Sequence, residues 1–320
     1  MSASIATGSP REDVRASATA LIGIDWGTTS ARAYRIADDG SVLDTRAAAL
    51  GILNVRDRAF AGALDTLLGD WRDLAVPRLA CGMIGSRQGW HEVAYCPTPG
   101  TLAALAAGIA TLPDGSLAIV PGLQTRDARG LPDVMRGEET QIVGAADAAA
   151  SLAWVVLPGT HSKWARVEQG SIVAFTTYMT GELYAALLDH TILGRLAVRN
   201  GGAFDQDAFG RGVRRALEGG ALTHDLFGAR TLALLGELDQ TAVADWLSGL
   251  LIGAEMHAVR REAAEVARVE VVGDPALARR YAIACRHAGL AATTAPPHAA
   301  ARGLWRLAVA AGLAPVGKRA

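Results

Sequence analysis

The stretch that most constrains this chain is residues 22–36, IGIDWGTTSARAYRI. An apolar run ends at Asp25, a Gly-Thr-Thr-Ser turn follows, and alternating apolar and polar residues resume, which predicts a strand, a tight turn and a returning strand. Backbone N–H groups around Gly27 and the hydroxyls of Thr28 and Thr29 can cradle a phosphate, while the Asp25 carboxylate can hold Mg²⁺. An ordinary β-hairpin, with glycine at a positive φ and aspartate capping the turn, explains the same residues.

Composition limits the classes of function. Half of the 320 residues are hydrophobic, which is enough for two domains with sizeable cores. The 31 basic and 32 acidic side chains nearly balance, so net charge favours neither a nucleic-acid partner nor an anionic membrane. Binding must therefore come from local sites.

The cysteines and two further segments bear on the compartment. Cys81, Cys96 and Cys285 are odd in number and widely spaced, which argues against a disulfide framework and a zinc site and fits a reducing cytoplasm. Residues 1–19 are small and polar, so we expect a disordered tail rather than a signal peptide. The most apolar later stretch, residues 246–259, is too short and too polar for a membrane span.

The first half alternates strand and helix patterns. Residues 41–49 predict a third strand after the opening hairpin, which makes a β-meander. The further elements expected before residue 150 are helices at 56–74 and 101–112, strands at 78–86 and 116–123, a polar loop at 124–136, and a helix from 137 with acidic residues in its first turn. The strand-helix-strand order implies a parallel strand beside the meander.

The second half repeats this order. Residues 152–178 predict an apolar strand, a Gly-Thr-His-Ser turn and two further strands, an internal echo of the first stretch. The later segments predict helices at 181–193, 205–218, 224–235 and 240–263, a strand, turn and helix around Gly273-Asp274-Pro275, a strand near 290–295 and a helix at 299–312. We expect an α/β protein with domains at 20–150 and 151–320 and a nucleotide cleft between them.

This duplicated pattern resembles the actin-like ATPases, whose paired domains are ribonuclease H-like. More narrowly, the chain resembles the 2-dehydro-3-deoxygalactonokinases, sugar-acid kinases of that superfamily, from about residue 21 to the C-terminal helix. The motifs that carry the resemblance are IDWGTTSARAY, GMIGSRQGW, IVPGL, VMRGEETQ, LPGTHSKW, MTGEL, WLSGLLIGAE and VVGDPALARRY. The resemblance implies phosphorylation of the 6-hydroxyl of 2-dehydro-3-deoxy-D-galactonate in galactonate breakdown, with ATP and Mg²⁺.

The second turn is the expected partner of the first in binding the ATP phosphates. Its residues are Gly159, Thr160, His161, Ser162 and Lys163. Pro158 stands where the superfamily commonly has an aspartate, so we expect Asp25 to be the principal Mg²⁺ carboxylate, through water. His161 or Lys163 would donate to the phosphates, unless both only cap a turn. Gly273 resembles the adenosine motif, although a strand-to-helix turn needs glycine in any case.

Phosphoryl transfer to an alcohol requires a carboxylate that accepts or orients the hydroxyl proton. Glu138 and Glu139 of MRGEETQ are the candidates, and the sequence does not separate them because helix capping explains one of them without chemistry. Arg136 can bind a carboxylate or a phosphate through its planar fork.

The glycine-rich loop GMIGSRQGWHEVAY is the expected sugar-acid pocket, because an acidic substrate needs cationic and N–H donors. Its candidate binding residues are Ser86, Arg87, Trp90 and Tyr95. A surface loop with a packed tryptophan is the alternative interpretation.

Other functions stay open on the sequence. The substrate could be another sugar acid or a hexose, and the GEE segment also suits a phosphoanhydride hydrolase like the exopolyphosphatases. Phosphate release without any sugar acid would favour that hydrolase. A non-enzymatic sugar-binding protein has the least support, since the chain has neither a helix-turn-helix segment nor a long polymerising insertion. Whether the chain forms a homodimer is open.

Overall fold

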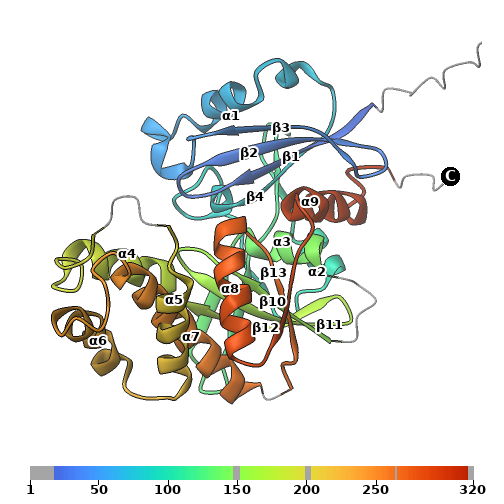
Figure 1. Cartoon of the computed structure of the whole chain (residues 1–320). Coiled ribbons are helices and arrows are strands. Elements are labelled where there is room, and N and C mark those ends of the chain that lie inside the picture. The colour runs from blue at the N-terminus through green and yellow to red at the C-terminus, as the bar shows by residue number, and fades with distance from the viewer. Residues whose placement is uncertain (1–17, 147–151, 199–202, 264, 316–320) are drawn as a thin grey trace, which may run out of the picture.

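The computed structural model describes residues 18–146, 152–198, 203–263 and 265–315. Within them the chain forms two large mixed β-sheets, with helices packed around each, and a smaller three-stranded sheet, which confirms the predicted α/β class (Figure 1). The expected tail lies outside the described residues except for its last two, and Thr19 already begins strand β1. No helix in the described ranges is long and apolar enough to cross a membrane.

The first sheet is the predicted meander extended by the parallel strands β4 and β7 and by the antiparallel edge strand β6. Its strands, in the order β3-β2-β1-β4-β7-β6, are Val42–Ala48, Ala31–Ala37, Thr19–Trp26, Arg78–Gly82, Ala118–Ile119 and Ala110–Thr111. β1 pairs antiparallel with β2 and parallel with β4, so Asp25 has Arg32 as one register partner and Cys81 as the other. The end of β1 is therefore central in the sheet.

Helix α1 covers one face of this sheet. It runs from Phe60 to Leu68, shorter than the predicted 56–74, and a 3₁₀ turn at Gly69–Asp73 follows. The α-helix ends because Gly69 takes a positive φ of 54°, which an L side chain adopts poorly. The apolar face of α1 packs with Trp26 and Ile24 in one buried cluster, as the helical spacing predicted.

The second sheet repeats the first. Its strands, in the order β12-β11-β10-β13-β14, are Ser171–Tyr178, Ser162–Glu168, Leu152–Leu157, Arg268–Val271 and Ala291–Thr294. β10, β11 and β12 form an antiparallel meander, and β13 and β14 extend it in parallel. The internal echo in the sequence thus corresponds to two similarly ordered sheets.

A helical layer flanks the second sheet (Figure 1). Its helices are α4 (Thr180–His190), α5 (Gln206–Leu217), α6 (Leu222–Leu234), α7 (Val243–Glu262) and α8 (Pro275–His287). α5 and α7 approach closely at glycines, since a Cβ at Gly249 would lie 2.0 Å from the Phe209 carbonyl oxygen and one at Gly212 would lie 2.1 Å from that of Trp246. Asp274 caps α8 by accepting from the backbone N–H groups of Ala276 and Leu277.

The predicted polar loop at 124–136 is wrong. These residues form a hairpin of β8 (Leu123–Arg126) and β9 (Pro132–Met135), and β5 (Cys96–Pro97) pairs with β8. Asp127 closes the turn by accepting from the backbone N–H groups of Arg129 and Leu131. The strands escaped prediction because much of the hairpin faces solvent, so no apolar run marks it. The helix expected at 101–112 is likewise shorter, α2 (Leu102–Ala107).

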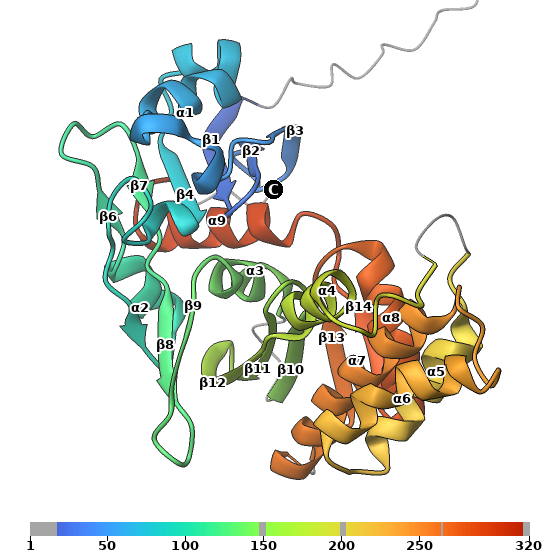
Figure 2. The ribbon, with the colours of Figure 1, turned by 90° about the vertical axis from the view of Figure 1, so that its left-hand side faces the viewer.

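The last helix returns to the first sheet. α9 (Ala299–Ala310) packs on α3 (Glu138–Ala145) and against β1, although it follows the second sheet in sequence (Figure 2). The two helices touch at glycines: a Cβ at Gly303 would lie 1.8 Å from the Thr140 carbonyl oxygen. The division of domains near residue 150 stays a prediction, because residues 147–151 lie outside the described residues.

Candidate active site

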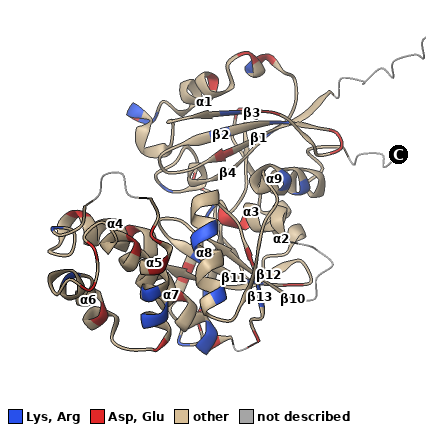
Figure 3. Cartoon of the chain, viewed as in Figure 1, with Lys and Arg blue, Asp and Glu red and all other residues tan. Residues whose placement is uncertain are grey.

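Three chain segments converge where β1, β4 and α3 meet. Gly82 ends β4 and Gly137 precedes α3, with positive φ values of 94° and 106°. A Cβ at Gly137 would lie 3.0 Å from the Gly82 Cα, and one at Gly82 would lie 2.6 Å from the Trp26 carbonyl oxygen. Glycine at these two positions therefore brings the end of β1, with Asp25, next to the acidic start of α3, which Figure 3 shows between the two sheets.

Asp25 is half-buried at the end of β1. The Cys81 thiol lies 3.9 Å from its Oδ1, and Arg32 is its partner across the β1–β2 ladder. Burial raises the pKa of Asp25 to about 6; the charge of Glu138 adds to the rise and that of Arg32 opposes it. Asp25 and Glu138 therefore feel each other's charge, as two carboxylates around one cation do.

The first turn is closed by its own backbone. The Gly27 N–H donates to the Ser30 carbonyl at 2.9 Å, so it holds the turn rather than facing a ligand. Thr28 and Thr29 are exposed. The segment at 51–54 supports them from behind, where the Asn54 amide donates to the Thr29 carbonyl at 2.8 Å.

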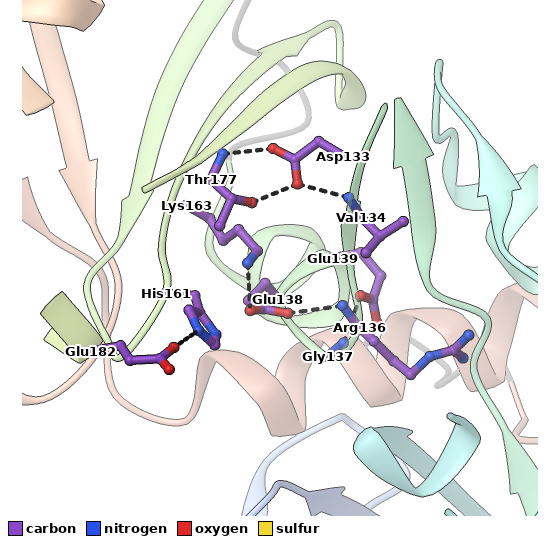
Figure 4. A network of polar contacts seen from close by, with 10 residues as sticks. All are labelled: Asp133, Val134, Arg136, Gly137, Glu138, Glu139, His161, Lys163, Thr177 and Glu182. Atoms are coloured by element: carbon purple, nitrogen blue, oxygen red, sulfur yellow. Dashed lines mark hydrogen bonds and ion pairs between the residues drawn. The ribbon is translucent and has the colours of Figure 1, made fainter. Parts of the chain in front are cut away.

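The structure separates the two glutamates that the sequence left equivalent (Figure 4). Glu138 is partly exposed; its Oε2 accepts from the Arg136 N–H at 3.0 Å, and its Oε1 lies 3.7 Å from the Lys163 ammonium of the second half. Glu139 is fully buried and accepts from the Gly137 N–H at 2.7 Å and the Thr140 hydroxyl at 2.9 Å. Burial, and secondly the charge of Glu138, raises the pKa of Glu139 to about 8.

In the second turn, His161 and Lys163 point in different directions. The His161 Nε2 lies 2.5 Å from a Glu182 oxygen at the start of α4, with both side chains about half exposed. The Glu182 N–H donates to the Thr160 carbonyl at 3.0 Å, so α4 braces the turn. The Lys163 side chain is buried and reaches Glu138, which joins the two halves of the chain.

Ser162 does not present its hydroxyl to a ligand. It donates to Glu255 Oε2 at 3.0 Å, and the same carboxylate accepts from Trp164 Nε1 at 2.8 Å and from the Tyr281 hydroxyl at 2.7 Å. Glu255 is 2% exposed, and burial raises the pKa of its carboxyl. This buried network holds the second turn in place, and its one signal in the sequence is a glutamate within the apolar stretch WLSGLLIGAE.

A pocket of about 160 Å³ lies beside the second turn. Its lining residues are Gly159, Thr180, Gly181, Tyr184, Ser248, Leu251, Ile252, Leu277, Arg280 and Tyr281. The Arg280 Nη1 is buried and has no hydrogen-bond partner among the described residues. Gly273, with a φ of 151°, lies near Pro158, whose oxygen would be 3.6 Å from a Cβ at this position.

The sugar-acid loop divides into two groups. The Arg136 guanidinium is buried, stacks 4.2 Å from the centre of the Tyr95 ring, and donates through Nη2 to the Val93 carbonyl at 2.7 Å. Its Nε and Nη1, and the hydroxyl of Ser86, are buried without a hydrogen-bond partner in the described part of the chain. A buried guanidinium with unused donors is well suited to bind an anionic group.

The two other loop residues lie elsewhere. The Arg87 side chain is 88% exposed and lies 3.5 Å from Glu92. Trp90 stacks on Phe60 of α1, with 6.2 Å between ring centres, and so packs against the first core. The alternative interpretation given for this loop therefore describes Trp90, whereas Tyr95 contacts Arg136 and Gly85, next to Ser86 in the chain, lies close to the Arg136 Nη1.

Comparison with known proteins identifies the family. The sequence model of the 2-keto-3-deoxy-galactonokinases matches residues 25–307. The chain belongs to this family. A probable 2-dehydro-3-deoxygalactonokinase of Rhizobium meliloti is 40% identical over 301 residues, 89% of this chain and 97% of the relative. The 2-dehydro-3-deoxygalactonokinase of Escherichia coli is 36% identical over 261 residues, 81% of this chain and 87% of the relative.

A solved structure supports the same placement in the galactonokinase family. A Sinorhizobium meliloti protein that carries the family name superposes with a TM-score of 0.83 at 38% identity, over 91% of this chain and 98% of that chain. The family resemblance based on the sequence motifs is confirmed, together with the two-sheet fold.

The residues of this family member fit a magnesium ion. No group of three or more His, Cys, Asp or Glu side chains within the described residues could by itself hold a metal. Mg²⁺ is commonly held by one or two carboxylates together with phosphate oxygens and waters. Asp25 and Glu138 provide two carboxylates that are coupled by charge, so these donors suit a cation that arrives with a nucleotide.

Proposed function

We propose that the chain transfers the γ-phosphoryl group of ATP to the 6-hydroxyl of 2-dehydro-3-deoxy-D-galactonate. The names of its relatives supply the substrate. The observation that carries the chemistry is the meeting of Glu138 and Lys163, 3.7 Å apart on different halves of the chain. A carboxylate and an ammonium that meet from different halves of the chain suit a transfer in which a proton leaves the acceptor while charge on the phosphoryl group is neutralised.

Glu138 is the proposed base in this reaction. Its partly exposed carboxylate is free of the buried bonds that hold Glu139, whose raised pKa keeps it protonated at neutral pH. Glu139 instead accepts from the backbone at the start of α3, which is a capping role. Lys163 would leave Glu138 for the γ-phosphate when ATP binds, which frees the carboxylate to accept the hydroxyl proton.

Asp25 is the proposed Mg²⁺ residue. The ion, when bound, would neutralise charge on the β- and γ-phosphates. Asp25 would hold it from the end of β1, and Arg32 would limit the repulsion between Asp25 and Glu138. The exposed hydroxyls of Thr28 and Thr29 and the backbone of the second turn would contact the phosphates, and the adenosine would enter the pocket beside Gly159.

Arg136 is the proposed anchor for the carboxylate of the sugar acid. Its Nε and Nη1 donors and the Ser86 hydroxyl have no hydrogen-bond partner among the described residues. They would bind the carboxylate of the substrate, which would also balance the buried positive charge. Tyr95 holds the guanidinium plane in place through the stacked ring. We also place the protein in the cytoplasm, because its three cysteines are free and two of them are buried.

A coupled ADP assay tests the function. ADP release should depend on the 2-dehydro-3-deoxy sugar acid and should exceed release with gluconate-derived acids or simple hexoses. Arg136→Met should lower kcat/KM for the sugar acid roughly tenfold to hundredfold, mainly through KM, because it removes a charged hydrogen-bond donor. Arg87→Met is the matched control, an exposed arginine of the same loop that should stay near wild type.

Two outcomes would overturn the proposal. The absence of ADP release with every sugar acid under saturating Mg·ATP would contradict the proposed kinase activity. Phosphate release without an acceptor would instead indicate a hydrolase. Equal losses in the Arg136 and Arg87 variants would remove the assignment of the carboxylate site.

A further inference from the structure

Strand β12, at the edge of the second sheet, is bound to the first half at both of its ends. Near its start, Ile172 exchanges two backbone hydrogen bonds with Gly100, of 2.8 and 3.1 Å. Near its end, Thr177 binds Asp133 of β9. β12 thus links the two halves, and the packing of α9 on α3 links them a second time.

The contact at Thr177 is made by a single carboxylate. Asp133 Oδ2 accepts from the Thr177 backbone N–H at 2.7 Å, and Oδ1 accepts from the Thr177 hydroxyl at 2.7 Å. Oδ1 also accepts from the Val134 N–H at 2.7 Å, which fixes the side chain to its own strand. Three donors to one partly buried carboxylate make a strong, directional link between the halves.

Both ends of this link lead directly to the reacting groups (Figure 4). Thr177 is the register partner of Lys163 on β11, so the two residues are neighbours across the ladder. Asp133 lies on β9, and the chain continues from the end of this strand through Gly137 to Glu138, the first residue of α3. The two halves are therefore linked at two neighbouring points. Asp133 and Thr177 make one contact, and Glu138 and Lys163 make the other.

We propose that Asp133 is a positioning residue for phosphoryl transfer. It holds β12, and through the ladder the backbone of Lys163, in place, while the Lys163 side chain stays free to move. The nucleotide would displace neither Asp133 nor Thr177. The hydrogen bonds between them therefore stay formed while the Lys163 side chain moves from Glu138 to the phosphate. This inference rests on the proposed roles of Glu138 and Lys163, and it adds a residue that touches neither substrate nor nucleotide.

Substitutions at the link test the proposal. Asp133→Asn keeps the shape but replaces one acceptor with a donor that opposes the donors of Thr177, and kcat should fall roughly tenfold to hundredfold, since small misplacements of reacting groups have effects of that size. KM for ATP and for the sugar acid should change by less than about threefold, because neither ligand loses a contact. Thr177→Val removes the hydroxyl donor and should also lower kcat. Thr177→Ser keeps both donors, so its kcat should stay close to that of the wild type.

Asp127→Asn is the matched control. Asp127 closes the turn of the same hairpin through bonds to residues 129 and 131. Its substitution therefore weakens the hairpin but leaves the bonds between Asp133 and Thr177 in place. Thermal unfolding of each variant reports on stability. If the Asp127 and Asp133 variants lose kcat in the same proportion to their loss of Tm, Asp133 is only structural and the proposal is overturned.

A double-mutant cycle separates this inference from the function on which it rests. If Asp133 acts through Lys163, the losses of kcat in Asp133→Asn and Lys163→Met are not additive in the double variant. Additive losses would overturn the positioning role and leave the base and the cation in place. Full activity in Lys163→Met and Glu138→Gln would instead overturn the proposed roles of those residues.

Discussion

At the scale of single residues, Asp25 is held in an environment that its charge disfavours. Because its pKa is raised to about 6 in the folded protein from an ordinary value of 3.8, folding binds a proton to this carboxyl between those pH values. The contribution of Asp25 to stability is therefore greatest below about pH 4, falls as the pH rises through 6, and stays low above it. A functional carboxylate kept charged at neutral pH costs stability.

We expect Asp25→Asn to lower kcat roughly a hundredfold or more while it stabilises the fold. At pH 7.5 the free energy of unfolding should rise by about 1 kcal/mol, less than the full shift implies because the side chain is partly exposed. Urea unfolding of variant and wild type at pH 7.5 and 4 measures this, and the difference should shrink at pH 4. Wild-type activity in the variant would contradict the metal role.

The two adjacent glutamates should respond differently to the same substitution. Glu138→Gln removes the proposed base and should lower kcat roughly a hundredfold or more. Glu139→Gln resembles the protonated form that burial already favours, so kcat at pH 7 should stay within about threefold of wild type. Initial rates of both variants at saturating substrates check this. Equal losses in both would mean that Glu139 takes part in the reaction.

Glu139 also predicts a pH dependence of stability. With a pKa raised to about 8 from 4.5, its contribution to the free energy of unfolding falls as the pH rises from about 4.5 through 8. The Glu139→Gln variant lacks this titrating group. Its free energy of unfolding, measured from pH 5 to 9, should therefore fall less steeply with pH than that of the wild type. An unchanged slope would show that the carboxyl is not protonated in the folded state.

At the scale of elements, the position of helix α3, which carries the proposed base Glu138, depends on its crossing with α9. The helices meet at Gly144 and Gly303, where an added Cβ would lie within 2 Å of a backbone oxygen of the other helix. Arg302 donates from α9 to the Gly144 carbonyl at 2.9 Å, which satisfies an orphan carbonyl at the end of α3. The C-terminal helix thus supports the element that begins with Glu138.

Gly303→Ala should therefore lower both stability and turnover. The new Cβ must push α9 away from the Thr140 backbone, at a cost of about 1–3 kcal/mol, and the shift of α3 should reduce kcat. Gly62→Ala is the matched control, since a Cβ there meets nothing within 4 Å and the residue lies inside α1, so stability should rise by up to about 1 kcal/mol. Equal thermal unfolding of the two variants would contradict a close crossing.

At the scale of the whole molecule, the proposed site lies where the two halves meet. Asp25 and Glu138 come from the first half and Lys163 from the second, while β12 and the crossing of α3 and α9 join them. A ligand that contacts both halves should therefore order both phosphate turns together.

Hydrogen exchange tests this coupling. With Mg²⁺ and a non-hydrolysable ATP analogue, exchange should slow at residues 27–30 and at residues 159–161, and the sugar acid should slow it further. The amides of Ile172 and Thr177 should change little, because their bonds to the first half are already formed. Protection of one turn alone would mean that the halves bind ligand independently.

The sequence by itself determined the local elements and the chemistry available to them. Apolar periodicity placed both meanders, the strand-turn motifs placed Asp25 and Lys163 at strand ends, and the motif order identified the family. These signals are local, because strand alternation, turn glycines and helix faces depend on neighbours in the chain. The exposed β8–β9 hairpin carried no such signal and was missed.

Tertiary structure decided which of these residues meet. It set Glu138 toward Lys163 and buried Glu139, and it turned Ser162 into the core beside Glu255. It left Arg87 in solvent and buried Arg136 with two nitrogens that bind no other described residue. It also carried α9 back to the first sheet and placed Asp133 against Thr177. Burial and contacts between distant segments depend on how the two halves pack, and adjacent residues in a sequence such as GEE do not encode that packing separately.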